Sequence, residues 1–352
     1  MNALVTGGAG FIGSHLSELL LARGARVRAI DAFTDFYPRP LKERNLEGLR
    51  GRDGYEFIEG DLRGVDLARV LDGVTHVFHL AALAGVRRSW GTEFGVYTGL
   101  NIDATQCLLE ACTKHPIERL VYASSSSVYG DDAAIPMVET GLPQPVSPYG
   151  VTKLAAEQLC HLYFANFGVP CVSLRYFTVY GPRQRPDLAI HSFTRAINEG
   201  RSIQQFGNGS TRRDYTYIDD IIQGMTACLD YNGQLCDVFN LGESQTTTLS
   251  ELIATIEASL GKKAVIFRHA LRNALNPVIT AITGWFAELL AGAFFVEYIF
   301  GWRGIGKITV DALEKLDYPV VMGAVLVSAC IFIIINMLAD LLYGLVDPRV
   351  RS

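Results

Sequence analysis

A tyrosine and a lysine four residues apart, in the segment SPYGVTKLAAE, are residue types that could do chemistry together. On a helix, Tyr149 and Lys153 would lie on one face, because side chains at this spacing neighbour each other. An ammonium beside a phenol favours the phenolate and lowers the pKa of the tyrosine, which would make Tyr149 a usable base near neutral pH. The spacing also occurs by chance on helix surfaces, so other residues must support this interpretation.

A glycine-rich turn near the N-terminus gives the first support. The turn GGAGFIG at 7–13 follows a short apolar run and precedes leucines at helical spacing. Its glycines Gly7, Gly10 and Gly13 let the backbone turn tightly, approach a pyrophosphate and pack a helix against the sheet. Asp31 ends the second predicted strand, where a carboxylate accepts hydrogen bonds from a ribose diol and repels a 2′-phosphate. The pattern therefore predicts a dinucleotide site that favours NAD over NADP.

The elements that must position these residues alternate between strand and helix. The predicted strands are Ala3–Thr6, Arg26–Asp31, Tyr55–Asp61, Thr75–Ala82 and Arg119–Ser125. Leu108, Leu109 and Cys112 mark one side of a helix before the last of them. Further on, Gly261–Phe267 predicts a turn and a short strand. Alternating elements indicate right-handed crossovers, so the expected fold class is α/β with a Rossmann-type doubly wound parallel sheet.

Charge and cysteine content narrow the function. A net charge of -5 argues against a nucleic-acid partner. Residues 268–352 carry seven Lys/Arg and seven Asp/Glu, so all of the net charge lies before them. The seven cysteines form no C-x-x-C pair and indicate reduced thiols in a cytosolic domain. Cys107, Cys112, His79 and His191 show no metal-ligand spacing, so no metal site is expected.

Taken together, these motifs resemble the extended short-chain dehydrogenase/reductase family, in its branch of NAD-dependent nucleotide-sugar epimerases and dehydratases. The matching segments are GGAGFIGSHL, Asp31, GDLR at 60–63, HLAA at 79–82, SSSSVYG at 124–130, SPYGVTK and LRYFTVYGPRQRPD at 174–187. They recur in order within residues 1–267. The resemblance implies NAD as cofactor, a UDP-sugar as substrate and a homodimer.

The resemblance also implies roles for particular residues. Ser125, Tyr149 and Lys153 would be catalytic, with Ser125 and Tyr149 bonding the sugar hydroxyl and Lys153 also holding the nicotinamide ribose. The implied cofactor residues are Gly7, Gly10, Phe11, Ile12, Gly13, Asp31, Asp61, Leu62, Ala81, Ala82, Asn101, Tyr149 and Lys153. Among these, Asp61 and Leu62 would flank the adenine. The implied substrate residues are Ser126, Thr178, Arg185 and Arg213, the last near a nucleotide phosphate.

The residues beside Ser125 distinguish reactions within this family. Dehydratases carry an Asp-Glu pair before VYG and decarboxylases usually a Glu, whereas this chain has Ser126 and Ser127, which are poor acids and bases near neutral pH. Redox at one carbon and its reversal is then the simplest reaction left. Tyr149 would take the C4 hydroxyl proton as a hydride passes to NAD⁺, and the hydride would return to the other face of the 4-keto sugar. The expected activity is an NAD-dependent nucleotide-sugar 4-epimerase.

The substrate is indicated by a smaller set of residues. GVRRSWG at 85–91, Thr178 and Arg185 look most like the UDP-glucuronate 4-epimerase branch. The Thr178 hydroxyl could hydrogen-bond a C6 carboxylate, and Arg185 could pair with it. Arg185 could instead be a surface charge or a phosphate contact, so UDP-glucose stays an alternative substrate.

The end of the chain changes character and becomes apolar. Segments 278–296, with one charged residue, and 320–339, with none, are each near the length needed to cross a bilayer. Two transmembrane α-helices are therefore expected, with lipid contact through residues 278–346. Arginines before the first span and after the second place both ends in the cytoplasm. The expected location is the inner (cytoplasmic) membrane, with the epimerase part on its cytoplasmic side.

The tail resembles the C-terminal end of a dipeptide/oligopeptide ABC transporter permease. The matching segments are RHALRNALNPVIT, FVEYIFGWRGIGKITVDAL, LDYPVVMGAVL and ADLLYGLVDPRVR. We therefore expect a chimera of an NAD-binding Rossmann domain (1–180), a truncated substrate-binding subdomain (181–267) and a permease-like membrane segment (268–352). Contact with an ABC ATPase is not expected, because the docking loop is absent from the matching segments. A permease component or a non-functional hybrid are the alternative functions.

Overall fold

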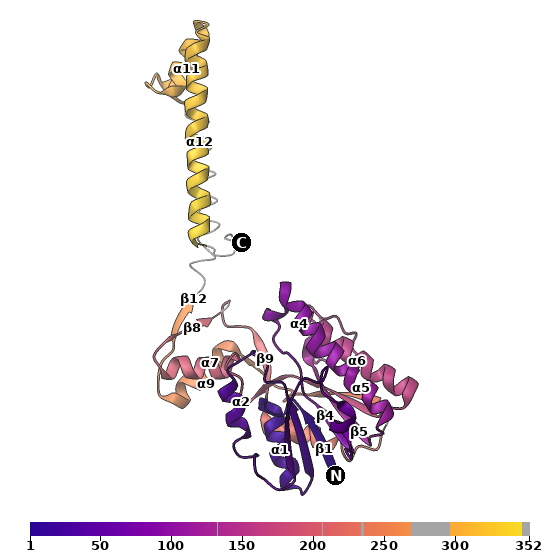
Figure 1. The fold of residues 1–352 in the computed structure, drawn as a ribbon. Coiled ribbons are helices and arrows are strands. Elements are labelled where there is room, and N and C mark those ends of the chain that lie inside the picture. Colours follow the sequence, from indigo (N-terminus) through magenta and orange to yellow (C-terminus); the bar gives the residue numbers. More distant parts are fainter. Residues whose placement is uncertain (132, 206, 234–235, 269–295, 347–352) are drawn as a thin grey trace. The chain divides into compact units, whose positions relative to one another are not determined.

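The chain folds into two compact units in the computed structural model, which describes residues 1–131, 133–205, 207–233, 236–268 and 296–346. The first unit comprises Met1–Arg201 with Ser210–Ala264. The second comprises Ser202–Gly209 with Val265–Ser352. Figure 1 labels their helices and strands along the sequence.

A parallel sheet forms the centre of the first unit. Its strands are β1 (Asn2–Thr6), β2 (Arg26–Asp31), β3 (Tyr55–Glu59), β4 (His76–His79), β5 (Arg119–Ser125), β6 (Cys171–Tyr176) and β10 (Cys236–Leu241). The strand order is β10-β6-β5-β4-β1-β2-β3, and each neighbouring pair is parallel. The chain runs outward from β1 to β3 and then continues on the other side of β1. This confirms the predicted doubly wound α/β fold.

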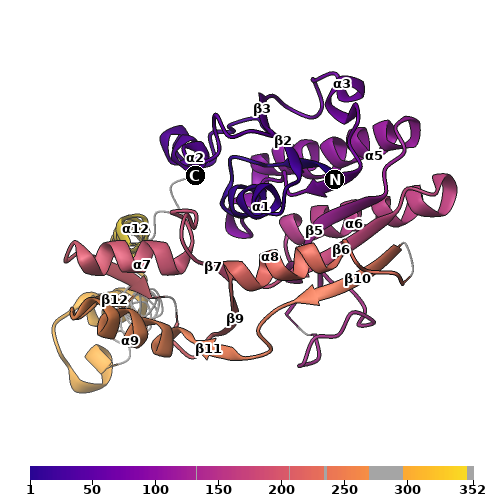
Figure 2. The ribbon, with the colours of Figure 1, turned by 90° about the horizontal axis from the view of Figure 1, so that it is seen from below.

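Helices cover both faces of this sheet, because successive strand residues point to opposite sides. The helices packed on it are α1 (Phe11–Ala22) and α8 (Ile218–Ala227) on one face and α3 (Leu67–Leu71), α5 (Ala104–Lys114) and α6 (Pro148–Phe167) on the other. The first unit also contains α2 (Arg39–Leu46), α4 (Phe94–Thr98), α7 (Ala189–Asn198) and α9 (Leu249–Leu260). Ala3 and Val5 of β1 pack with α1 and α8, whereas Leu4 packs with α5 and α6. Figures 1 and 2 show β1 between α1 and α5.

The predicted strands agree with the sheet to within one residue except at two ends. β3 ends at Glu59 rather than at Asp61, and β4 ends at His79 rather than at Ala82. In each case the neighbouring strand ends at the same level, since Asp31 pairs with Glu59 and Thr6 with His79. Beyond these pairs β2 and β1 offer no further partner, and β4 also leaves β5, which continues from Tyr122 to Ser125. The predicted helix with Leu108, Leu109 and Cys112 on one side is confirmed, because all three are buried in α5.

Helix α6, which carries Tyr149 and Lys153, has a defined start and end. Ser147 is its N-cap, and its hydroxyl accepts a hydrogen bond from the backbone N–H of Gly150 at 3.1 Å. Gly168 ends the helix in the left-handed conformation with φ 71°. The predicted placement of the Tyr-x-x-x-Lys motif on one helix is therefore confirmed.

Shorter elements complete the first unit. They are β7 (Thr178–Tyr180), β9 (Arg212–Tyr217), β11 (Thr246–Thr248), η1 (Arg87–Ser89), η2 (Gly91–Glu93), η3 (Gly99–Asp103) and η4 (Ser126–Val128). β9 lies between β7 and β11, parallel to the first and antiparallel to the second. α9 begins at a capping box in which Thr248 and Glu251 bond each other's backbone N–H groups.

The second unit contains a strand pair and, among its described residues, a helical stretch at 296–300 and the helices α11 (Ile305–Glu314) and α12 (Tyr318–Val346). β8 (Ser202–Gln205) and β12 (Val265–Arg268) are parallel, which confirms the strand predicted near the end of Gly261–Phe267. α11 packs against α12.

The prediction of two transmembrane helices is not supported. Nearly all of the first predicted span, 278–296, lies outside the described residues. The second, 320–339, lies within α12, so a helix is confirmed there. Within the described ranges, however, we find no helix with both the length and the apolar character that crossing a membrane requires.

Candidate active site

A pocket opens at the carboxyl ends of β1 and β4, where the strand order reverses. Such a switch point is the usual place for a ligand in an open parallel sheet. The predicted site residues that line it are Gly7, Gly10, Phe11, Ile12, Gly13, Asp31, Asp61, Leu62, Ala81, Ala82, Tyr149, Lys153 and Arg185. Residues of the glycine turn and of the Tyr-x-x-x-Lys motif are thus brought together in one cavity.

The glycine turn forms one wall of this pocket, and two of its positions require glycine. Gly7 has φ 71°, and a Cβ there would lie 3.0 Å from the backbone nitrogen of Ala81. A Cβ on Gly13 would collide with the carbonyl oxygen of Gly7. Gly10 caps α1 without a side-chain hydrogen bond, so the first N–H groups of this helix are left for another acceptor. This arrangement fits a pyrophosphate.

Asp31 lies at the end of β2 with its carboxylate held by the backbone. Its Oδ2 accepts a hydrogen bond from the N–H of Ala9 at 3.2 Å, and its Oδ1 accepts one from the N–H of Phe33 at 2.8 Å. Burial raises the pKa of Asp31, while Lys42 and these two N–H groups act in the opposite direction. The carboxylate lines the pocket, so its remaining lone pairs can accept bonds from a ribose diol.

Lys42 is a pocket residue that sequence reasoning missed. Its ammonium donates to the carbonyl oxygen of Thr34 at 2.9 Å and lies 4.9 Å from the ring centroid of Tyr37. Burial lowers the pKa of Lys42, whereas the charge of Asp31 raises it. Lys42 follows Asp31 by eleven residues on another element, and a single lysine at that distance in the sequence carries no recognisable motif.

Thr6 fixes the segment that follows β4. Its Oγ1 accepts hydrogen bonds from the N–H groups of Leu80 at 3.1 Å and Ala81 at 3.0 Å. Both acceptor positions of the hydroxyl are then used, so its own proton points to Nδ1 of His79, 2.8 Å away. One threonine therefore holds the pocket wall at Ala81 against β1.

The same contacts determine the protonation of His79. Because Nδ1 accepts from Thr6, the ring proton lies on Nε2, which donates to Oγ1 of Thr105 at 2.9 Å. Thr105 in turn donates to the carbonyl oxygen of Asn101 at 2.7 Å. Burial, together with the charge of Lys153, lowers the pKa of His79 to about 3. His79 is thus a neutral structural residue.

Tyr149 and Lys153 face the pocket from α6, but their titration differs from the prediction. Burial raises the pKa of Tyr149, while a hydrogen bond with Ser125 and the charge of Arg185 lower it. Burial also lowers the pKa of Lys153 to about 8. The expectation that the lysine leaves Tyr149 with a lowered pKa is therefore wrong here. Loss of contact with water raises the pKa of the phenol by more than the nearby groups lower it.

Arg185 reaches the pocket from the segment after β7. Its guanidinium forms a salt bridge with Asp187 at 2.9 Å and lies 5.1 Å from the ring centroid of Phe36. Arg88 lies over the same ring at 4.7 Å. Phe36 was not anticipated from the sequence, because an aromatic residue in a loop shows no periodicity that would indicate its contacts.

The other predicted site residues do not line the pocket. Asn101 is buried, donates to Thr152 at 3.0 Å and accepts from the N–H of Leu83 at 2.7 Å, so it joins the pocket edge to α6. Ser125 contacts Tyr149 just beside the lining residues. Ser126, Thr178 and Arg213 lie on η4, β7 and β9 respectively.

Metal ligation has no candidate in the part of the chain that the structure describes. Across those residues, no group of three or more His, Cys, Asp or Glu side chains is arranged to hold an ion. His161 and Cys236 do approach each other, at 3.6 Å, but as a pair only.

Comparison with known families divides the chain in two. Residues 3–242 match the family described as the NAD dependent epimerase/dehydratase family. Residues 258–352 match the family described as the binding-protein-dependent transport system inner membrane component. Both resemblances expected from the motifs are confirmed, and the chimera interpretation fits them.

Individual relatives cover the first part of the chain. The uncharacterized UDP-glucose epimerase YtcB of Bacillus subtilis (strain 168) is 46% identical over 267 residues, covering 76% of this chain and 84% of that protein. UDP-glucuronate 4-epimerase 2 of Arabidopsis thaliana is 40% identical over 284 residues, covering 75% of this chain and 65% of that protein.

A solved structure gives the same comparison in three dimensions. The UDP-glucuronic acid 4-epimerase from Bacillus cereus, in complex with UDP-glucuronic acid and NAD, has a TM-score of 0.74 and 44% identity. The similarity covers 76% of this chain and 86% of that one.

Replacing Thr6 by valine tests the hydroxyl that holds Ala81. Valine keeps the shape and the carbonyl that Leu80 also bonds, but it leaves the N–H of Ala81 without its acceptor and Nδ1 of His79 without its donor, so we expect the free energy of unfolding in urea to fall by about 2 kcal/mol. The affinity for NAD, measured by calorimetric titration, should fall as well. Thr113→Val is the control, because its exposed hydroxyl only donates to Glu110. Equal stability and affinity in Thr6→Val and the parent would contradict this role.

Proposed function

Because the chain belongs to the NAD dependent epimerase/dehydratase family, we propose that its first unit is a nucleotide-sugar 4-epimerase acting through a transient 4-keto sugar. The family is NAD dependent, which confirms the expected cofactor. The observation that carries the proposal is the convergence of Gly7, Asp31, Tyr149 and Arg185 on one pocket. A dinucleotide site, a buried tyrosine and a cation for the substrate then meet at a single place.

The residues present fit NAD. The uncapped N-terminus of α1 suits the pyrophosphate, and Asp31 suits the adenosine ribose. Asp61 and Leu62 line the same pocket and are proposed to flank the adenine. Bound NAD would supply the hydride acceptor for oxidation at one sugar carbon. Lys153 is proposed to hold the nicotinamide ribose through its ammonium.

Tyr149 is proposed as the base that removes the proton of the sugar C4 hydroxyl. Its hydrogen bond with Ser125 and the charge of Arg185 both favour the phenolate, against the effect of burial on its pKa. Ser126 and Ser127 follow Ser125 in the sequence, and neither hydroxyl is an acid or base near neutral pH. The site therefore has the groups for reversible oxidation at C4 and lacks the extra acid–base pair that removal of water would require.

UDP-glucuronate is the proposed substrate, with UDP-glucose as the alternative. Arg185 lies in the pocket that holds Tyr149, where its guanidinium can pair with a carboxylate. Relatives named for UDP-glucuronate and for UDP-glucose both resemble this chain. Thr178, Ser126 and Arg213 are proposed as further substrate contacts, with Arg213 near a phosphate.

Substituting Tyr149 by phenylalanine tests the proposed base. Epimerisation should fall by at least a thousandfold, because no other group removes the C4 proton, while the affinity for NAD stays within about twofold. Turnover is measured by separating the two UDP-sugars, and NAD binding by calorimetry. Tyr163→Phe, on the same helix but bonded to Gln106 and Glu110, is the control. Unchanged turnover in Tyr149→Phe would remove this mechanism, and an inactive parent would favour the non-functional hybrid.

Substituting Arg185 by methionine tests the substrate. Loss of a charge-assisted pair should raise KM for UDP-glucuronate about tenfold more than KM for UDP-glucose. Steady-state kinetics with both sugars gives this ratio. Arg195→Met is the matched control, because Arg195 pairs with Glu199 on the surface of α7. If both sugars are affected equally, the carboxylate role of Arg185 is wrong and a phosphate or surface role is favoured.

We also propose that the tail associates the chain with the inner membrane through residues 278–346, with the epimerase part on the cytoplasmic side. Two observations support this: the match to an inner membrane component and the exposed apolar side chains of α12, among them Val325, Leu326, Ile333 and Met337. The domain limits 1–180, 181–267 and 268–352, the homodimer and the lack of ATPase contact stay predictions.

Membrane association is tested by fractionating cells that express the full chain. Detergent, and not high salt, should release it from the membrane pellet, because apolar contacts do not weaken with ionic strength. A cytosolic marker enzyme and an integral membrane marker are followed in the same fractions. Recovery of the chain with the cytosolic marker would overturn the proposed location.

A further inference from the structure

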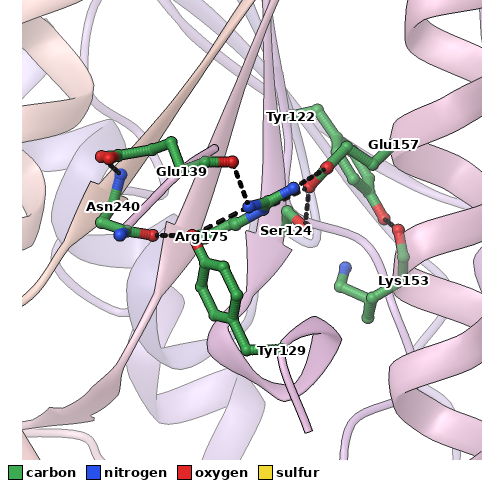
Figure 3. A network of polar contacts seen from close by, with 8 residues as sticks. All are labelled: Tyr122, Ser124, Tyr129, Glu139, Lys153, Glu157, Arg175 and Asn240. Atoms are coloured by element: carbon green, nitrogen blue, oxygen red, sulfur yellow. Dashed lines mark hydrogen bonds and ion pairs between the residues drawn. The ribbon is translucent and has the colours of Figure 1, made fainter. Parts of the chain in front are cut away.

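A buried ion pair lies behind the catalytic helix. Arg175 of β6 and Glu157 of α6 are both about 4% exposed, and the pair is bidentate. The guanidinium donates to Glu157 Oε1 through NH2 at 2.6 Å and to Oε2 through Nε at 3.1 Å. Figure 3 shows the arginine reaching from its strand to the carboxylate on the helix.

Burial of two charges is a poor way to gain stability. Desolvation opposes the attraction, and apolar residues of similar size often stabilise a core equally well. Removing one partner, in contrast, leaves an unpaired buried charge and costs much more. The pair therefore suggests a role for the charge itself, and its surroundings indicate which one.

Glu157 contacts the strand end that carries the catalytic serine. Its Oε2 accepts a hydrogen bond from the hydroxyl of Ser124 at 2.7 Å, and Ser125 is the next residue along β5. Glu157 also follows Tyr149 and Lys153 at successive intervals of four residues, so all three share one face of α6. Figure 3 shows Lys153 and Glu157 pointing to the same side of the helix. One carboxylate thus links both halves of the proposed catalytic centre.

Arg175 secures the other side of the network. Its NH1 donates to the hydroxyl of Tyr129 at 2.8 Å and to the carbonyl oxygen of Glu139 at 3.2 Å. Tyr129 donates to Oδ1 of Asn240 at 2.7 Å, on β10. With the guanidinium held on this side, its charge is compensated by Glu157 and by neutral acceptors, and the carboxylate remains turned from α6 toward Ser124 of β5.

We infer that Glu157 is a positioning residue that keeps Ser125 in register with Tyr149 and keeps Lys153 in its charged form, an inference that rests on the proposed function. Lys153 is 3% exposed, so its ammonium needs a compensating charge nearby. The titratable groups around it are His79 on β4, Tyr122 on β5, and Glu157 and Cys160 on α6, with Tyr149 one turn earlier on the same helix and Arg175 bonded to Glu157.

Glu157 is the carboxylate among these groups. His79 is neutral, burial raises the pKa values of Tyr122 and Tyr149, and Tyr122 offers the face of its ring, 4.8 Å from the ammonium. Burial lowers the pKa of Lys153 to about 8, and Cys160 and Glu157 act against it.

The test is the pH at which Lys153 loses its proton in variants of Glu157. In Glu157→Gln the ammonium loses its facing charge, so its pKa should fall by about one unit. NADH affinity, followed by fluorescence between pH 6 and pH 10, should then weaken at correspondingly lower pH. The alkaline limb of the kcat profile should move in the same direction. If kcat falls by the same factor at every pH and its pH profile does not move, Glu157 only supports the fold.

A double variant separates charge from stability. Glu157→Leu with Arg175→Met removes the pair without leaving a buried charge, so its Tm should return close to that of the parent. Removing both charges leaves the net charge around Lys153 unchanged, so its pKa should lie between those of the parent and Glu157→Gln, while kcat should still fall because the hydroxyl of Ser124 has lost its acceptor. A folded double variant with the parent's kcat would overturn the inference that Glu157 positions the serine, also in the case that Glu157→Gln does not fold.

A matched control and a second readout complete the experiment. Glu110→Gln removes a carboxylate that bonds α6 at Tyr163, away from Lys153, and should leave the pH dependence unmoved. NADH binding does not require turnover, so it separates the two proposals. A shift in binding together with an inactive parent would disprove the 4-epimerase function and keep the role of Glu157. Normal epimerisation without a shift in NADH binding would keep the 4-epimerase function and disprove the role of Glu157.

Discussion

Removal of water from the catalytic side chains is the constraint on which the site depends. Lys153, Glu157 and Arg175 are each nearly fully buried, and Tyr149 and Asp31 have their pKa values raised by burial. A charge in such surroundings persists only when hydrogen bonds or an opposite charge compensate it. The backbone N–H groups on Asp31 and the guanidinium on Glu157 have this function. The same exclusion of water strengthens any electrostatic contact to a bound substrate.

Much of the fold could be predicted from local pattern. The glycine turn, Asp31 and the Tyr-x-x-x-Lys pair are short-range signals, and the sheet follows from the alternation of strands and helices. Strand ends were less certain, because β3 and β4 stop where their neighbours β2 and β1 stop. That limit is a property of the pair of strands, and an apolar run that continues past it gives no sign of the change.

The contacts that tune the site could not be predicted in this way. Arg175 meets Glu157 from another element, and Lys42 meets Thr34 across a loop. Each contact depends on how strands and helices pack against one another, and the spacing of residues in the sequence carries no information about that packing. The pKa of Tyr149 shows the consequence: the spacing to Lys153 was read correctly, but the sign of the shift is set by burial. The position of a residue on a helix face predicts its neighbours on that helix, whereas its pKa depends on every group that surrounds it.

The two family matches meet between residues 242 and 258, just before β12, a strand whose ladder bonds come from backbone groups. β12 pairs with β8 from Val265 with Ser202 to Arg268 with Gln205, through backbone groups that every residue except proline supplies. The match to the transport family begins at 258, within α9, so β12 lies inside it, whereas its partner β8 lies inside the match to the epimerase family. The chain beyond Arg268 can then differ without interrupting the ladder. This explains how an α/β unit with an intact nucleotide pocket and a permease-like tail can belong to one chain.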